Sequence, residues 1–213
     1  MFDGRFKTQI ERYVRPVGES LRRTGLSPDH FTLLGLCVAA ASAVAIGTGK
    51  MQLGLLLVIC SALPDLLDGA LAKASNSASQ RGAFFDSVVD RVSDSFLFGG
   101  VAWFYASSDT PQFSIVPFAI LGASLIISYE RAKAESLGLY AKGGLMERAE
   151  RIILLCFGLL FDSLLKWVMV VMLVLVVMTA VQRFAKVWKQ AAVAPVTAEK
   201  QAIRRSRRAS RRA

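Results

Sequence analysis

The sequence predicts an all-α integral membrane protein with six transmembrane helices and an N-terminal amphipathic helix lying in the membrane interface. Of its 213 residues, 54% are hydrophobic, yet 26 are Lys or Arg. The apolar residues gather in runs long enough for membrane-embedded helices, and the charged residues lie between those runs. Lys and Arg are also distributed unequally between alternate connections, as expected for a multi-pass membrane protein.

Residues 1–24 form the first predicted unit, a helix at the membrane surface. Apolar residues recur every three or four positions, and Arg and Lys occupy the other faces. Pro16 is expected to kink this helix. An amphipathic helix packed on protein is the alternative interpretation. The apolar positions are Phe2, Phe6, Ile10, Val14, Val17 and Leu21.

Residues 25–189 form the predicted membrane domain. Turn-forming stretches such as SSDTPQ, and the pair Asp162 and Ser163, separate its apolar runs. Residues 190–213 are rich in arginine and are expected to be a disordered cytoplasmic tail that binds anionic lipid. The six predicted spans cover residues 31–48, 51–73, 86–106, 113–129, 152–161 and 164–180.

The distribution of positive charge predicts the orientation of the chain. If residues 1–30, 73–91, 130–151 and 183–213 are cytoplasmic, only Lys50 and Lys166 among all Lys and Arg residues fall on the other side. The prediction is a multi-pass protein of the inner membrane with both termini in the cytoplasm. The net charge of +10 would also suit a nucleic-acid partner, but the long apolar runs favour an anionic membrane surface and no nucleic acid.

Two pairs of aspartates lie at the ends of apolar runs. Asp65 and Asp68 are three residues apart, and Asp86 and Asp90 are four apart, so each pair shares one helix face. Four carboxylates converging from two helices repel one another unless cations lie between them, and hard oxygen ligands favour Mg²⁺. With a single histidine, His30, the chain offers no His-rich site.

An ion-pair cluster of purely structural role is the alternative for these aspartates, with Lys73, Arg81 and Arg91 as partners. Asp94 continues the row one turn beyond Asp90. It is expected either to support the metal ligands or to pair with Arg91 or a lysine.

The same stretch resembles the signature of the CDP-alcohol phosphotransferases, D-x2-D-G-x2-A-R, eight residues, then G-x3-D-x3-D. Lys73 stands where the family usually has Arg; it keeps the charge but loses the bidentate fork of a guanidinium. The matching residues are Asp65, Asp68, Gly69, Ala72, Lys73, Gly82, Asp86 and Asp90.

This resemblance implies an enzyme in which an alcohol hydroxyl attacks the lipid-linked phosphorus of a CDP-activated donor and releases CMP. It implies two Mg²⁺ ions, with Mn²⁺ as the alternative, bound by Asp65, Asp68 and Asp86. Asp90 would lie at the metals as a fourth ligand and act as general base towards the hydroxyl. The residues implied for the donor, CDP-diacylglycerol, are Asp29, Thr32, Gly69, Lys73 and Ser79.

For the acceptor, the stretch ISYERAKAESLGLYAKGGLMERAER, together with GLSPDHFT and VQRFAKVW, resembles the actinobacterial phosphatidylinositol phosphate synthases. These join CDP-diacylglycerol to inositol 1-phosphate, and members of the family form homodimers. The simpler interpretation of basic residues near the membrane is that they only follow the positive-inside rule. The residues implied for the inositol phosphate are Lys133, Arg148 and Arg183, followed by Arg151 and Arg131.

Several alternatives remain. An archaeal-type enzyme with an ether-lipid donor would look similar. A phosphatidylglycerophosphate synthase is disfavoured, because the N-x-L-T-x-x-R turn usual near its first span is absent. A transporter would show repeat symmetry between its halves, which this sequence lacks. A non-catalytic membrane scaffold would not explain four aspartates at these spacings.

Overall fold

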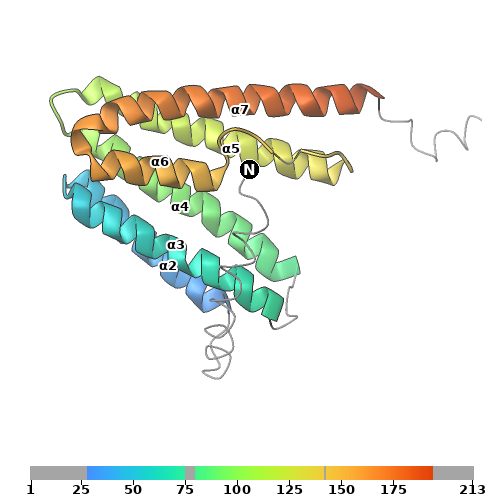
Figure 1. Ribbon diagram of the computed structural model, residues 1–213, viewed down its shortest axis with the longest axis horizontal. Helices are drawn as coiled ribbons and strands as arrows, with labels where there is room; N and C mark the ends of the chain where they lie inside the picture. The colour runs from blue at the N-terminus through green and yellow to red at the C-terminus, as the bar shows by residue number, and fades with distance from the viewer. Residues whose placement is uncertain (1–27, 75–79, 142, 194–213) are drawn as a thin grey trace, which may run out of the picture.

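A computed structural model describes the backbone of residues 28–74, 80–141 and 143–193, and the side chains of residues 29–62, 80–141 and 143–192. Within these residues the secondary structure is entirely helical, with two short 3₁₀ turns, η1 (Pro111–Ser114) and η2 (Asp162–Leu164). The α-helices are α2 (Pro28–Gly47), α3 (Met51–Ala74), α4 (Gln80–Ala106), α5 (Ile115–Ser136), α6 (Arg148–Leu160) and α7 (Leu165–Val193) (Figure 1).

Each of the six predicted apolar runs falls within one of these helices apart from one or two residues at its ends, so the all-helical prediction is confirmed for the described part of the chain. Three segments are long and apolar enough to cross a membrane, residues 29–47, 111–136 and 162–192. In α3, the part with described side chains that counts as apolar is Met51–Ala62. Helix α6 has 13 residues. At a rise of 1.5 Å per residue it is about 20 Å long, less than the roughly 30 Å of a hydrocarbon core.

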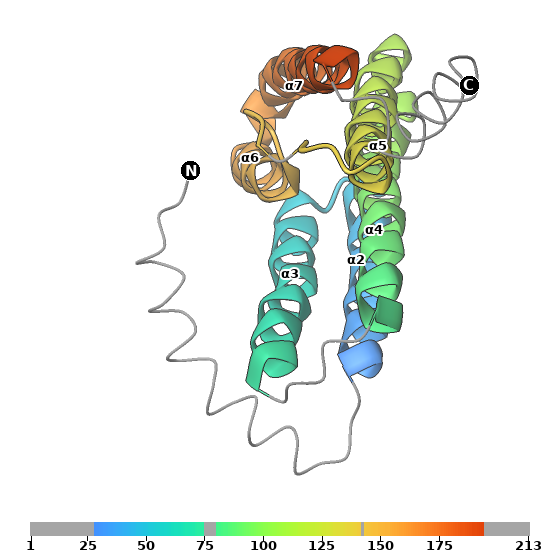
Figure 2. The ribbon, with the colours of Figure 1, turned by 90° about the vertical axis from the view of Figure 1, so that its right-hand side faces the viewer.

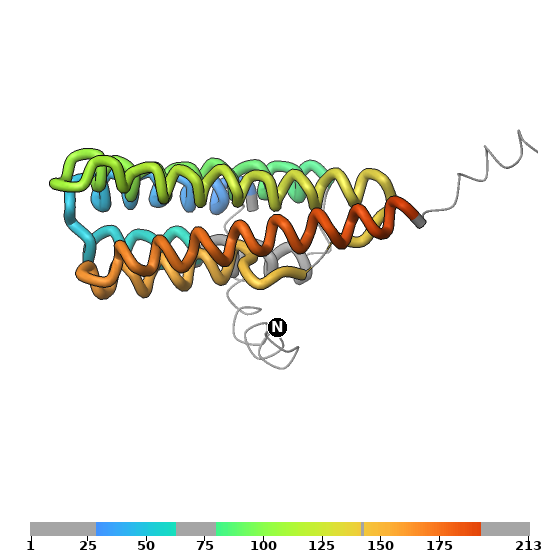
Figure 3. Tube along the Cα trace, turned by 90° about the horizontal axis from the view of Figure 1, so that it is seen from above, coloured from blue at the N-terminus to red at the C-terminus, as the bar shows by residue number. Residues whose placement is uncertain are grey.

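The helices form two groups that meet along α4. Helix α2 packs on α3 and α4, whereas α5 packs on α7, and the groups are joined by contacts of α4 with α5 and of α3 with α6. Figure 2 shows α2, α3 and α4 in one group and α5, α6 and α7 in the other. In Figure 3 the α2–α3, α4–α5 and α6–α7 connections lie together at one end of the bundle. The described residues of the α5–α6 connection, 137–141 and 143–147, belong to the opposite half.

Apolar side chains fill the space between the helices and also cover the outside of the bundle. Phe98, Leu97, Ile120, Leu155 and Met169 are among the large side chains that are fully buried. Exposed side chains include many large apolar ones, which a water-soluble protein rarely presents in such number. They match the outer surface of a membrane protein. Examples are Leu34, Phe118, Trp167, Val181 and Trp188.

The connection between α5 and α6 folds back into the bundle. Helix α5 ends at Ser136, the following Gly138 has a φ of +72°, which suits a glycine, and the Leu139 amide donates to the Ala134 carbonyl at 2.8 Å. Further on, the Gln190 side chain of α7 donates to the Tyr140 carbonyl at 2.7 Å and accepts from the Tyr140 amide at 3.0 Å. This part of the connection is therefore fastened to α7.

Some predictions concern residues that the structure does not describe. The predicted interfacial helix (1–24) and residues 194–213 of the predicted tail lie outside the described part of the chain. Helix α7 extends to Val193, so residues 190–193 continue the helix beyond the predicted end of the membrane domain. The predicted turn at Asp162 is a 3₁₀ turn in which the Asp162 carboxylate accepts from the Ser163 amide at 2.9 Å.

Gly100 provides a test of the packing between α2 and α4. A Cβ atom at this position would lie 2.6 Å from the carbonyl oxygen of Ala43, a backbone atom that cannot move aside alone. We expect Gly100→Ala to destabilise the protein in detergent by about 1–3 kcal/mol, although alanine favours a helix. Thermal unfolding followed by tryptophan fluorescence measures this. Gly99→Ala is the matched control, because nothing lies within 4 Å of a Cβ at Gly99. Equal midpoints for the two variants would contradict the packing argument.

Candidate active site

Helix α4 presents three carboxylates on one face. Asp86, Asp90 and Asp94 follow one another at intervals of four residues, so helical geometry alone aligns them. Their exposure falls along the helix: Asp86 is exposed, Asp90 is half-buried, and Asp94 is only 4% exposed. A buried carboxylate requires compensating charge or hydrogen bonds, and these come from the start of α6.

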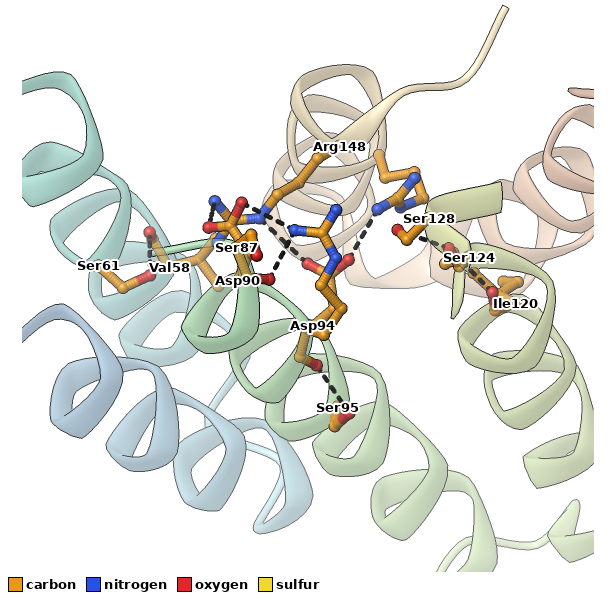
Figure 4. Close-up of polar contacts among 12 residues, drawn as sticks. Val58, Ser61, Ser87, Asp90, Asp94, Ser95, Ile120, Ser124, Ser128 and Arg148 are labelled. Carbon is orange, nitrogen blue, oxygen red and sulfur yellow. Dashed lines mark hydrogen bonds and ion pairs between the residues drawn. The ribbon is translucent and has the colours of Figure 1, made fainter. Parts of the chain in front are cut away.

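Arg148 and Arg151 of α6 provide that charge. Arg148 forms an ion pair with Asp90 through Nη1, and its Nε lies 3.4 Å from Oδ1 of Asp94, so one guanidinium bridges both carboxylates (Figure 4). The Nη2 atom of Arg151 donates to Oδ2 of Asp94 at 2.7 Å. On its other side, Asp90 lies 3.3 Å from Nη1 of Arg91.

A polar cavity of about 230 Å³ lies where α4, α5, α6 and α7 meet. Five arginines and four carboxylates contribute to its lining, which leaves one positive charge in excess. A cavity of this kind, with guanidinium groups that form bidentate hydrogen bonds, is suited to an oxyanion. The charged lining residues are Arg91, Arg131, Arg148, Arg151, Arg183, Asp90, Asp94, Glu147 and Glu150.

Arg183 of α7 also lines this cavity. It is 4% exposed, and its guanidinium donates to the carbonyls of Ile127 and Gly143 and to the Glu147 carboxylate, each at 3.1 Å. The Nε atoms of Arg183 and Arg151 and the Oε2 atom of Glu150 are buried and have no hydrogen-bond partner among the described residues. Buried polar atoms normally have partners. Two such donors and one such acceptor beside one cavity indicate a place for a further hydrogen-bonding group.

A larger groove of about 870 Å³ runs between α4 and α5. Asp86 lines this groove, and so do exposed apolar side chains such as Phe84 and Val92. The groove and the polar cavity share four lining residues. Asp90, which had been predicted to be the catalytic base, therefore borders both spaces. The shared residues are Asp90, Arg91, Ser128 and Arg131.

The four predicted metal ligands occupy two helices, but only two of their side chains are described. Asp65 and Asp68 lie in α3, in the part whose side chains the structure does not describe. Asp86 and Asp90 lie one turn apart on α4. The side chains that are described include no cluster of three or more His, Cys, Asp or Glu residues that could hold a metal ion. The predicted four-carboxylate centre is therefore left as a prediction.

The residues predicted for the donor that the structure describes lie near the start of α2 and the end of α3. Asp29, in the first turn of α2, pairs with Arg81 in the first turn of α4 at 3.4 Å. Thr32 is buried, with 5% of its surface exposed. Gly69 and Lys73 lie in α3 beyond the described side chains, and Ser79 is outside the described residues.

Of the residues predicted for the acceptor, the structure brings four together. Arg131, Arg148, Arg151 and Arg183 all line the polar cavity. Lys133 is exposed in the last turn of α5 and does not belong to that lining.

The partners of Asp94 and Arg183 were not predicted from the sequence. Asp94 pairs with Arg148 and Arg151, not with Arg91 or a lysine. Glu147, the partner of Arg183, is not among the predicted site residues, although it directly precedes Arg148 in the acidic and basic stretch MERAER.

Comparisons with known proteins identify relatives of this chain. A family model described as CDP-alcohol phosphatidyltransferase matches residues 26–181. A phosphatidylinositol phosphate synthase of Mycolicibacterium smegmatis is 36% identical over 146 residues, which cover 68% of this chain and 66% of the relative. An archaetidylinositol phosphate synthase of Methanothermobacter thermautotrophicus is 34% identical over 190 residues, or 87% of this chain and 93% of the relative.

Solved structures of the Mycobacterium tuberculosis phosphatidylinositol phosphate synthase are also similar. With CDP-DAG bound, that enzyme has a TM-score of 0.77 and 35% identity, covering 83% of this chain and 94% of its own. Its complex with manganese and citrate has a TM-score of 0.77 and 34% identity, covering 82% and 88%.

The polar cavity predicts binding of an oxyanion. Inorganic phosphate is expected to raise the thermal unfolding midpoint of the detergent-solubilised protein, because a ligand that binds only the folded state stabilises it. Arg148→Gln should reduce that rise to less than half. This variant leaves no carboxylate orphaned, since Asp90 keeps Arg91 and Asp94 keeps Arg151.

Lys189→Gln is the control, because it removes a positive charge from an exposed position on α7. An equal response to phosphate in both variants would mean that the ion binds elsewhere.

Proposed function

Since the chain belongs to the CDP-alcohol phosphatidyltransferase family, we propose that it transfers the phosphatidyl group of CDP-diacylglycerol to a hydroxyl of inositol phosphate, giving phosphatidylinositol phosphate and CMP. The observation that carries this proposal is the arginine-rich cavity that opens beside Asp90. An acceptor without a phosphate, such as free inositol, would leave the positive charge of the cavity and its buried hydrogen-bond donors without an anionic partner.

The proposed acceptor site consists of Arg148, Arg151 and Arg183, with Arg131 at its edge. Two observations support an anionic acceptor there: the excess of arginine over carboxylate, and the partnerless Nε atoms of two buried arginines. Lys133, exposed two residues beyond Arg131, is proposed to attract the anion from outside the cavity.

The proposed donor site is the region between α2, α3 and α4, continuing into the groove between α4 and α5. Gly69 would allow close approach of the cytidine part of the donor, and Lys73 and Ser79 would contact the donor's phosphates or nucleotide. Asp29 and Thr32 would bind the nucleotide from α2. The volume of the groove is within the roughly 300–1,000 Å³ usual for small-molecule sites, and a related enzyme has been solved with CDP-DAG bound.

We further propose that Asp65, Asp68, Asp86 and Asp90 hold two divalent cations, with Mg²⁺ as the physiological ion. Carboxylate oxygens are the ligands that Mg²⁺ and Mn²⁺ prefer, and a related enzyme has been solved with manganese. When bound, such ions would offset the charge of the diphosphate and of the leaving group.

In the proposed reaction, a carboxylate oxygen of Asp90 accepts the proton of the inositol hydroxyl. The hydroxyl oxygen forms a bond to the lipid-linked phosphorus, and the bond from that phosphorus to the CMP oxygen breaks. CMP leaves with the electron pair of that bond. The position of Asp90 between the groove and the cavity supports this role, because the base must reach a hydroxyl that meets both substrates.

The proposed setting is the inner membrane, with six embedded helices and both termini in the cytoplasm. We propose that residues 1–24 lie on the membrane surface, that residues 25–189 form the membrane domain and that residues 190–213 bind anionic lipid. Two chains would form the homodimer. The only Lys or Arg residues in the three connections at one end of the bundle and in the adjoining helix ends are Lys50 and Lys166. This low number of positive charges supports the proposed orientation.

Release of CMP from CDP-diacylglycerol tests the acceptor. With Mg²⁺, we expect turnover with inositol 1-phosphate to exceed turnover with inositol or glycerol 3-phosphate by at least an order of magnitude, because inositol lacks the phosphate and glycerol 3-phosphate lacks the inositol ring. Chelation by EDTA should abolish turnover, and added Mg²⁺ should restore it.

Preference for glycerol 3-phosphate would overturn the acceptor but keep the donor. Turnover with an ether-lipid analogue of the donor in place of CDP-diacylglycerol would indicate the reaction of the archaeal relative.

Replacement of Asp90 tests the base. Asp90→Asn should lower kcat for CMP release by about 10²–10⁴-fold, because an amide cannot accept the proton. Its thermal midpoint should remain within a few degrees of the wild type, since Arg148 keeps Asp94 as a partner. Asp109→Asn, an exposed position in the turn after α4, is the control for loss of one carboxylate. Undiminished turnover by Asp90→Asn would exclude Asp90 as the base.

A further inference from the structure

We propose that Asp94 is a positioning residue of the acceptor site, which holds Arg148 and Arg151 in the orientation that binds the acceptor's phosphate. This inference rests on the proposed function and adds to it a residue outside the family signature. Asp94 itself would not touch the anion. It would act only through the two guanidinium groups that it contacts.

The contacts of Asp94 leave it no other polar role among the described residues. Its Oδ2 accepts from Arg151 at 2.7 Å and its Oδ1 faces Nε of Arg148 at 3.4 Å, so each oxygen is directed at one arginine. The carboxylate is 6% exposed. A carboxylate buried this deep costs free energy unless it is paired with positive charge and hydrogen-bonded, and here the two arginines provide both.

Arg151 in turn has few other means of orientation among the described residues. Arg151 has only one further hydrogen bond, a 3.4 Å contact from Nη1 to the Met146 carbonyl, and its Nε has no partner among the described residues. An arginine side chain has several rotatable bonds, and fixing it costs conformational entropy. Asp94 would fix the Arg151 side chain before the anion binds, so that this loss of entropy does not weaken anion binding. The remaining donors of Arg151 would stay available to the phosphate.

The position of Asp94 also relates the acceptor to the catalytic base. Asp90 and Asp94 lie one turn apart on α4, about 6 Å along the helix axis, and Arg148 contacts both. The proposed phosphate-binding arginines are therefore held in position by contacts with α4, the same helix that carries Asp90. We infer that this arrangement sets which hydroxyl of the bound polyol lies at Asp90.

The test compares the KM values of the two substrates. Asp94→Asn keeps the shape of the side chain but loses its charge. We expect it to raise KM for inositol 1-phosphate at least tenfold while KM for CDP-diacylglycerol stays within twofold. Ser93→Ala, a buried polar residue of α4 outside the cavity lining, is the matched control and should change neither KM. A residue with a purely structural role would lower the amount of active enzyme without separating the two KM values.

Coupling to Arg151 provides a second readout. If Asp94 acts through the arginines, adding Asp94→Asn to Arg151→Gln should raise the acceptor KM by a clearly smaller factor than Asp94→Asn does alone. Independent, multiplicative effects would overturn the inference, as would an unchanged acceptor KM in Asp94→Asn.

If Asp94→Asn does not fold, Asp94→Glu replaces it, because it keeps the charge but displaces the carboxylate by one methylene. A rise of threefold or more in acceptor KM, with donor KM unchanged, is then expected, and wild-type values for both would overturn the inference.

Lack of wild-type turnover with inositol 1-phosphate would count against the proposed function instead. Normal wild-type turnover with an unaffected Asp94 variant would count against Asp94 alone.

Discussion

Arginine can be buried in an apolar helical bundle only where oxygen atoms surround its guanidinium, and this constraint organises the centre of the molecule. Arg151 and Arg183 are nearly inaccessible. Asp94 of α4 compensates the first, and Glu147 together with backbone carbonyls compensates the second. These oxygens come from α4, α5 and the connection before α6. The polar contacts thus fix how the two groups of helices face each other, and the apolar packing fills the space around them.

The parts of the fold that depend on local sequence were predictable. Apolar runs identify six helices, and intervals of four residues place Asp86, Asp90 and Asp94 on one face, because both signals arise within a single helix. The partners of Asp94 were not predictable in this way. Arg148 and Arg151 lie 54 and 57 residues away, and only the path of the chain between α5 and α6 brings them to α4.

The residues predicted for the acceptor show that sequence alone also does not decide which of two neighbouring side chains on one helix reaches a site. Arg131 and Lys133 were predicted together, yet two residues on a helix are separated by about 200° around its axis. Arg131 lines the cavity and Lys133 does not. A list of basic residues near a helix end therefore does not indicate which of them share a site. That distinction requires the neighbouring helices, and for Asp65 and Asp68, whose side chains are not described, it has to come from experiment.

The short α6 has a consequence for how two substrates of opposite solubility can meet. Arg148, its first residue, pairs with Asp90, which lies ten residues into α4 and so about 15 Å from the start of that helix. Among the described residues, α6 thus lies only in the half of the bundle that holds the α6–α7 connection, and the polar cavity at its first turn is a recess lined by charge. A water-soluble reactant can descend into this recess while a lipid-linked reactant stays at its usual depth. Neither has to leave its own phase.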